Sequence, residues 1–318
     1  MISVCGLTKY YQDHLALDRV SFEVDAGDVV GFLGPNGAGK STTMKIITCF
    51  LPPSAGTAKV AGFDIIDKPL EVRKRIGYMP ENVPLYFEMR VKEYLNFRAK
   101  IKDVPRNGRK ARIEKVMERC WLADVSRQTI GTLSKGYRQR VGIADAMVSD
   151  PEILILDEPT IGLDPSQVRQ VRSLIRELGQ DHTVLLSTHI LPEVEIVCDK
   201  VIIINGGRIA VADSLEGIRQ SSGELVEYYL EIAGPADAVR QILSTVDGVT
   251  ELREHTPHHA EGRTVGFVFK VPRNSNAPEA IAARVVKNGW GVRELRRGER
   301  TLEDVFVDVV SKEQVTAA

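Results

Sequence analysis

The octapeptide GPNGAGKS (34–41) has residue types and spacing that suit the binding of phosphate groups. Its glycines let the backbone curl so that successive N–H groups point inward at phosphate oxygens. The loop follows an apolar run, VVGFL (29–33), and leads into a segment that we expect to be helical from Lys40 to about Phe50. Lys40 can then reach the β- and γ-phosphates of a nucleoside triphosphate, and the Ser41 hydroxyl can ligate Mg²⁺.

A glycine-rich turn without a ligand is the alternative, but a loop between a strand and a helix N-terminus favours an anion site. The expected nucleotide-binding residues of this loop are Gly34, Asn36, Gly37, Ala38, Gly39, Lys40, Ser41 and Thr42. Lys40 is also expected to act in catalysis.

Two acids follow another apolar run in ILILDEP (153–159). A buried strand that ends at Asp157 would place a carboxylate beside the phosphate loop, where it can hold Mg²⁺ directly or through water. Glu158 can polarise an attacking water as a general base. Alternatively, the two acids could simply lie at a solvated strand end without a ligand. The phosphate loop earlier in the chain argues against that interpretation.

His189 comes after a third apolar run, in LLSTHIL (185–191). A lone histidine is more often structural than catalytic. Here, however, polar groups follow three strands at the sheet edge where open α/β sheets bind ligands. An imidazole N–H could therefore contact a γ-phosphate and sense its presence.

The elements that carry these residues alternate between strands and helices over residues 1–220. Apolar runs separated by helix-like segments predict a mainly parallel sheet that is covered on both faces. The first segment alternates in polarity, which is typical of antiparallel strands. We predict one domain over 1–220 and a second over 224–318, because small and polar residues cluster at SSGE (221–224).

The second segment has the order β-α-β-β-α-β, which predicts a small α+β domain of the ferredoxin-like kind. Its expected hairpin loop is PHHAEGR (257–263). His255, His258 and His259 gather there, and metal binding is one reading. A solvated loop is favoured because no acid or cysteine completes a set at ligand spacing.

Composition limits the function classes. The chain has 318 residues, 43% of them hydrophobic and 27% charged, which is typical of a globular protein with a sizeable core. Its net charge of −1 argues against sequence-independent nucleic-acid binding. The four cysteines are scattered and are read as reduced thiols. Neither a signal peptide nor an apolar run long enough to span a bilayer is predicted, so membrane association would require a partner.

The segment LSKGYRQRVGIADAM (133–147) distinguishes between families that share a phosphate loop. It resembles the signature of ABC ATPases, and with the motifs above the resemblance covers about the first 220 residues. The resemblance implies a head-to-tail homodimer in which each ATP lies between the phosphate loop of one subunit and the signature of the other. Ser134 and Gly136 would then bind the γ-phosphate of the partner's nucleotide.

The same resemblance assigns further residues. GLDP (162–165) matches the D-loop, so Asp164 is expected at the dimer interface. Tyr11 matches the aromatic residue that stacks on adenine. Tyr10 is the alternative, and either residue could simply be a half-buried strand aromatic.

Two features depart from the family pattern. The signature has Lys135 and Tyr137 where Gly and Gln are usual. The Q-loop, IGYMPEN (76–82), has Glu81 in place of Gln. Glu81 can ligate Mg²⁺ through oxygen, but as a carboxylate it cannot donate a hydrogen bond.

IGYMPEN and the ending TLEDVFVDVV (301–310) resemble ATPases of type-2 ABC exporters of the gliding-motility and daunorubicin-resistance kind. This implies a peripheral subunit on the cytoplasmic face of the membrane, bound to separate permease chains. The segment from Pro84 to Lys102 is the expected permease-facing surface, with Leu85, Tyr86 and Phe87 as its socket. These three residues could instead pack inside the helical subdomain. A non-transport ABC ATPase and an importer ATPase are the competing classes.

Overall fold

The computed structural model describes residues 1–220, 225–257, 264–298 and 301–316. The chain divides into two compact units, one of residues 1–215 together with 306–318, and the other of residues 216–305. The last helix, α11 (Leu302–Thr316), thus contributes most of its length to the first unit, where the Asn205 side-chain amide donates to the Val309 carbonyl at 3.3 Å. The domain boundaries predicted at 220 and 224 fall on or beside residues that lie outside the described part and remain a prediction.

A central sheet organises the first unit, with its strands in the spatial order β10-β9-β3-β8-β7-β6. The five neighbouring strands β9, β3, β8, β7 and β6 are parallel to one another. Strand β10 pairs antiparallel with β9 at one edge. Every residue of β3, β7 and β8 is buried, as expected for parallel strands with both faces covered. The strands are β3 (Val29–Leu33), β6 (Ile76–Met79), β7 (Ile153–Asp157), β8 (Thr183–Thr188), β9 (Lys200–Asn205) and β10 (Arg208–Ser214).

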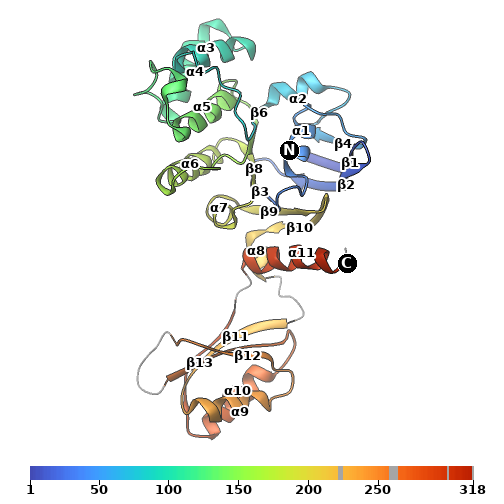
Figure 1. Cartoon of the computed structure of the whole chain (residues 1–318), viewed down its shortest axis with the longest axis vertical. Coiled ribbons are helices and arrows are strands. Elements are labelled where there is room, and N and C mark those ends of the chain that lie inside the picture. The colour runs from blue at the N-terminus through green and yellow to red at the C-terminus, as the bar shows by residue number, and fades with distance from the viewer. Residues whose placement is uncertain (221–224, 258–263, 299–300, 317–318) are drawn as a thin grey trace. The chain divides into compact units, whose positions relative to one another are not determined.

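One face of the central sheet packs against α1 and a second, antiparallel sheet of order β2-β1-β4-β5. Helices α6 and α7 cover the other face, and Figure 1 shows them on the side away from α1. Both predicted features, the parallel sheet and the antiparallel N-terminal part, are confirmed. The elements are β1 (Ile2–Tyr11), β2 (His14–Val24), α1 (Lys40–Ile47), β4 (Ala55–Val60), β5 (Phe63–Asp64), α6 (Pro165–Leu178) and α7 (Leu191–Val197).

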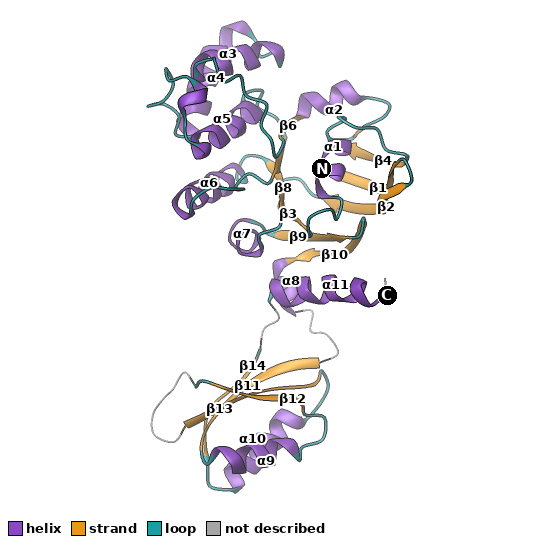
Figure 2. Ribbon diagram, in the orientation of Figure 1, coloured by secondary structure: helices purple, strands orange, loops and turns teal. Residues whose placement is uncertain are grey.

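Helices α3, α4 and α5 form a separate lobe of the first unit (Figure 2). Helix α3 buries one face, with Val91, Tyr94, Leu95 and Ala99, whereas α5 is buried at every position from Gln139 to Met147. The lobe lies between β6 and β7 in the sequence, so it inserts after the predicted Q-loop. The remaining elements of this unit are α2 (Pro69–Arg75), α3 (Val91–Ile101), α4 (Arg106–Arg119), a 3₁₀ turn (Ile130–Thr132) and α5 (Lys135–Met147). Helix α8 (Leu215–Gln220) begins at residue 215, where the first unit passes into the second.

The second unit has an antiparallel sheet of order β12-β13-β11-β14 with α9 and α10 against one face (Figure 2). Its core contains buried residues of both helices and of the sheet, such as Val239, Ile281 and Phe267. This is the ferredoxin-like arrangement that the element order predicted. The elements are β11 (Leu225–Ala233), α9 (Ala236–Ser244), β12 (Thr250–His255), β13 (Thr264–Pro272), α10 (Ala277–Lys287) and β14 (Gly291–Arg297).

Most of the predicted hairpin loop, with His258 and His259, lies outside the described residues. His255 ends β12, where its Nδ1 lies 2.7 Å from the Thr256 carbonyl. Within the described ranges, no group of three or more His, Cys, Asp or Glu side chains could hold a metal ion.

Candidate active site

The phosphate loop joins the end of β3 to the start of α1, and its glycines have steric reasons to be there. Gly39 caps the helix at a φ of 108°, which side chains disfavour, and a Cβ there would lie 2.6 Å from Leu17. A Cβ on Gly34 would lie 2.3 Å from the Ile204 carbonyl oxygen. Only glycine therefore fits at positions 34 and 39 without displacing these neighbours.

Lys40 is 7% exposed, and its ammonium donates to the loop carbonyls of Gly34 at 2.8 Å and Pro35 at 3.3 Å. Lys40 Nζ also lies 3.7 Å from Glu158 Oε1, so one cation faces both the loop and the predicted general base. The structure places the other predicted loop residues around it, with Asn36 and Gly37 exposed, Ala38 buried, and Ser41 and Thr42 half-buried in the first turn of α1.

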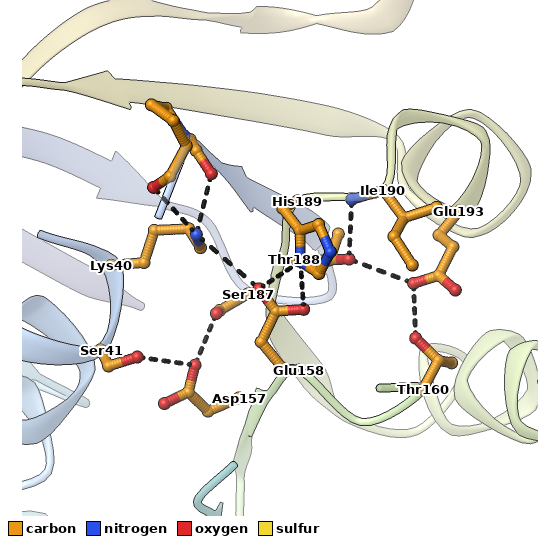
Figure 3. Close-up of polar contacts among 12 residues, drawn as sticks. Lys40, Ser41, Asp157, Glu158, Thr160, Ser187, Thr188, His189, Ile190 and Glu193 are labelled. Atoms are coloured by element: carbon orange, nitrogen blue, oxygen red, sulfur yellow. Dashed lines mark hydrogen bonds and ion pairs between the residues drawn. The ribbon is translucent and has the colours of Figure 1, made fainter. Parts of the chain in front are cut away.

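The Asp157 carboxylate, 1% exposed, lies beside this first turn. Its Oδ1 accepts hydrogen bonds from the Ser41 hydroxyl at 3.3 Å and from the Ser187 hydroxyl at 2.6 Å (Figure 3). Ser187 comes from the neighbouring strand β8, which parallel pairing brings level with Asp157. A hydroxyl and a carboxylate oxygen at this distance are the hard donors that Mg²⁺ prefers, so the residues present fit that ion.

Glu158 and His189 meet at the carboxyl ends of β7 and β8, as the sequence predicted for polar residues at one sheet edge. His189 Nδ1 lies 2.9 Å from Glu158 Oε2 (Figure 3). Glu158 is 5% exposed, whereas the His189 side chain is 40% exposed and can also be reached from outside. The structure therefore brings together Lys40, Ser41, Asp157, Glu158 and His189.

Glu81 lies in the loop after β6 and is exposed. Tyr78 of β6 lies level with Ile155 of β7, so its side chain shares a sheet face with Asp157. Burial raises the pKa of the Tyr78 hydroxyl, and the negative charges of Asp157 and Glu81 raise it further. Among the described residues the buried Tyr78 hydroxyl has no hydrogen-bond partner.

The signature and D-loop residues occupy the starts of two helices. Ser134 caps α5 and accepts from the Tyr137 N–H at 3.4 Å, while a Cβ on Gly136 would lie 2.6 Å from the Gln167 side chain. Asp164 caps α6, where hydrogen bonds from Gln167 N–H and Ser166 lower its carboxyl pKa. Among the described residues, no hydrogen bond or ion pair joins these groups to the phosphate loop of the same chain.

The two candidate adenine-stacking residues both lie at the end of β1. Tyr10 is 50% exposed and Tyr11 is 42% exposed, so either ring is accessible. The Lys9 ammonium lies 5.5 Å from the centre of the Tyr11 ring.

The sequence analysis missed several polar residues behind the site. Ser187 holds Asp157, and a buried network joins Thr160, Thr188 and Glu193. The polar triplet after the apolar run of β8 could have indicated Ser187 and Thr188. Glu193 gave no signal, because a glutamate in LPEVEIV has the pattern of an ordinary exposed helix residue.

The ABC transporter family model matches residues 17–161 of the chain. An uncharacterised ABC transporter ATP-binding protein of Bacillus subtilis is 32% identical over 98% of this chain and 99% of its own length. A bacitracin transport ATP-binding protein of Bacillus licheniformis is 30% identical over 98% of this chain and 97% of its own. A daunorubicin resistance ATP-binding protein of Streptomyces coeruleorubidus is 34% identical over 78% of this chain and 79% of its own.

Solved structures give the same result. An ATP-binding subunit of an ABC transporter, 32% identical, aligns with a TM-score of 0.63 over 69% of this chain and 92% of its own. A bacterial ABC transporter cassette solved as a dimer, 25% identical, aligns with a TM-score of 0.62 over 68% of this chain and 99% of its own. No described helix has the length and apolar character needed to cross a membrane. With the phosphate loop and the acid–histidine cluster, these similarities show that the chain binds and hydrolyses ATP and belongs to the ATP-binding subunits of ABC transporters.

Proposed function

We propose that two copies of this subunit close around two ATP molecules and drive export through separate permease chains on the cytoplasmic face of the membrane. The observation that carries the catalytic part is the convergence of Lys40, Asp157, Glu158 and His189 at one sheet edge. In this proposal each nucleotide lies between the Lys40 loop of one subunit and the signature residues of the other. Among the described residues, Ser134 and Gly136 make no hydrogen bond or ion pair with their own phosphate loop, which supports that sharing.

Each residue then has a role. Glu158 holds the attacking water and takes its proton, and the nearby Lys40 ammonium stabilises the phosphoryl oxygens. As an imidazolium, which donates from both ring nitrogens, His189 can hold Glu158 through Nδ1 and the γ-phosphate through Nε2. Ser41 and Asp157, with Glu81 at the loop edge, would hold Mg²⁺, which supplies charge neutralisation at the phosphates when bound.

Export is supported by the two relatives whose names refer to bacitracin transport and daunorubicin resistance. We place the permease contact on the surface between Pro84 and Lys102. Tyr86 is 50% exposed and Phe87 is 52% exposed, while Leu85 is half-buried. The Tyr86 ring also packs at 5.5 Å from Phe97, so this surface is both accessible and anchored in the helical lobe.

The variant Glu158→Gln tests the proposal, because it keeps the shape of the side chain and removes the base. We expect ATP hydrolysis to fall by at least ~100-fold while ATP binding is retained. In the presence of ATP, the tagged variant purified from membranes should form a stable dimer. An integral membrane protein with several transmembrane spans should copurify with it.

Glu195→Gln is a suitable control, because Glu195 is an exposed residue of α7 that is not among the predicted site residues. Wild-type hydrolysis by the Glu158→Gln variant would contradict the catalytic assignment. A trapped dimer that retains ATP without a membrane partner would contradict the assignment to export.

A further inference from the structure

A buried carboxylate lies directly behind the active site and has no part in the chemistry above. Glu193 is in α7 and is only 1% exposed, whereas Glu195 of the same helix is exposed. Acidic side chains are rarely buried to this extent unless they have partners. The partners of Glu193 therefore indicate what it does.

One oxygen of Glu193 joins the end of strand β8 to the turn that follows strand β7. Its Oε2 accepts hydrogen bonds from the Thr160 hydroxyl at 2.7 Å and from the Thr188 hydroxyl at 3.1 Å (Figure 3). The Thr188 hydroxyl oxygen in turn accepts from the Ile190 N–H at 3.1 Å. All of these groups except the Ile190 backbone belong to residues that are 3% exposed or less.

These contacts involve the chain segments that carry His189 and Glu158. Thr188 and Ile190 are the residues on either side of His189, so their bonds fix its backbone. Thr160 lies two residues after Glu158 and fixes that loop. Glu193 Oε2 is thus one acceptor shared by residues next to both ends of the 2.9 Å contact between His189 and Glu158.

The other oxygen of Glu193 extends the network to helix α6. Glu193 Oε1 lies 3.5 Å from a guanidinium nitrogen of Arg172, which is in α6. Helix α6 begins directly after Asp164, its N-cap. Glu193 therefore contacts the elements that carry the general base, the histidine and the interface aspartate.

We infer that Glu193 is a positioning residue that holds Glu158 and His189 at their working separation and connects them to helix α6. The inference rests on the roles proposed above for Glu158 and His189. It concerns the rate of the chemical step, because Glu193 touches neither the phosphate loop nor the expected nucleotide site. A purely structural role, in which Glu193 only fastens α7 to the sheet, predicts a loss of stability instead.

The test compares ATPase kinetics of Glu193→Gln with those of Glu195→Gln in the full-length chain. We expect Glu193→Gln to lower kcat by about 10- to 100-fold, because small displacements of catalytic groups have effects of this size. The KM for ATP should stay within about twofold, and Glu195→Gln should match the wild type. Equal kcat values for the two variants would overturn the inference.

Thr160 provides a second pair of variants, which leave the Glu193 carboxylate in place. Thr160→Val keeps the volume and removes the hydroxyl, so it should lower kcat as Glu193→Gln does. Thr160→Ser restores the hydroxyl and should restore the rate to within about threefold. If Ser and Val variants behave alike, the bond to Glu193 does not position the base.

A double variant separates positioning from stability. If Glu193 acts through His189, the losses from Glu193→Gln and His189→Ala should not add, since groups that act as a unit are non-additive. Additive losses that track a lower Tm would overturn the inference. Glu158→Gln serves as the separate reference, because its failure to lower kcat would contradict the proposed function and not the network.

Discussion

Glu158 has an uncommon backbone conformation for a residue with a long side chain. Its φ is 50°, in the left-handed region that costs on the order of 1 kcal/mol or more for residues other than glycine. The conformation is held because the Glu158 N–H donates to the Ser187 carbonyl at 3.0 Å and its carbonyl accepts from Ile161 at 3.2 Å. The bend directs the carboxylate toward Lys40 and His189.

Two glycines of the phosphate loop allow backbone strain and crowding to be separated. Gly37 and Gly39 both have positive φ, but an added Cβ meets no atom within 4 Å at Gly37 and crowds Leu17 at 2.6 Å at Gly39. We expect Gly37→Ala to lower the free energy of unfolding by about 1 kcal/mol and Gly39→Ala by about 2–4 kcal/mol. Urea denaturation measures both. Equal losses would show that the loop absorbs the methyl group without displacing Leu17.

The residues expected to bind phosphate and Mg²⁺ could be predicted from sequence, because that chemistry restricts residue type at fixed spacing. This holds for Lys40, Ser41 and Asp157. Thr160 and Glu193 could not be predicted, because their partners are 33 residues apart in the chain and are brought together only by packing. The burial of an acidic side chain such as Glu193 depends on residues distant in sequence, so its sequence neighbours do not indicate it.

At the scale of elements, the helical lobe depends on an ion-pair cluster between α3 and α5. Asp145 of α5 is 5% exposed and accepts from Arg98 at 2.9 Å and from the Tyr94 hydroxyl at 3.2 Å. Lys102 also pairs with it at 3.2 Å, although burial lowers the pKa of that lysine. The cluster ties the helix after the Q-loop to the helix that begins with the signature.

Removal of the Asp145 charge should therefore destabilise the lobe. We expect Asp145→Asn to lower the free energy of unfolding by about 2–4 kcal/mol, because it leaves partly buried cations without a counter-charge. Asp150→Asn is the matched control, since Asp150 pairs with Arg112 at the surface and the change should cost less than about 1 kcal/mol. Similar losses in urea denaturation would show that Asp145 stabilises no more than a surface pair.

The elements themselves were largely predictable. Apolar runs such as Ile153–Asp157 and Val29–Leu33 gave the central strands, because a sheet covered on both faces needs no polar alternation. The predicted end of α1 was less accurate, because the helix ends at Ile47 and not near Phe50. Residues Thr48 and Cys49 leave the helix, and Cys49 takes a positive φ of 57°, which sequence periodicity does not indicate.

At the scale of the whole molecule, the sequence did not indicate that the last helix packs with the first unit. Residues 306–318 belong to the same compact unit as residues 1–215, although residues 216–305 form the other unit. Amphipathic spacing in 302–316 indicates a helix but not the surface on which it packs. Long-range placement of this kind depends on which apolar surface is left uncovered after the rest has folded.

The cysteines allow the cooperativity of the first unit to be measured. Cys5 is exposed, whereas Cys120 in the helical lobe and Cys198 beside the central sheet are buried. Burial raises the pKa of the Cys120 thiol to about 12 and that of Cys198 higher than usual as well. Because the thiolate is the reactive form, both buried thiols should react with iodoacetamide only after the unit opens.

ATP should slow the reaction of both buried thiols by the same factor if the lobe and the sheet open together. At an ATP concentration of about 100 Kd, binding stabilises the folded state by about 2.7 kcal/mol, which is an approximately 100-fold decrease in the open population. Mass spectrometry of the alkylated peptides measures each site, and Cys5 should react at an unchanged rate. Adenosine monophosphate, which lacks the phosphates that Lys40 is expected to reach, is the control ligand. Slowing at Cys198 without slowing at Cys120 would show that the helical lobe opens while the nucleotide remains bound to the sheet edge, so the two parts would not form one cooperative unit.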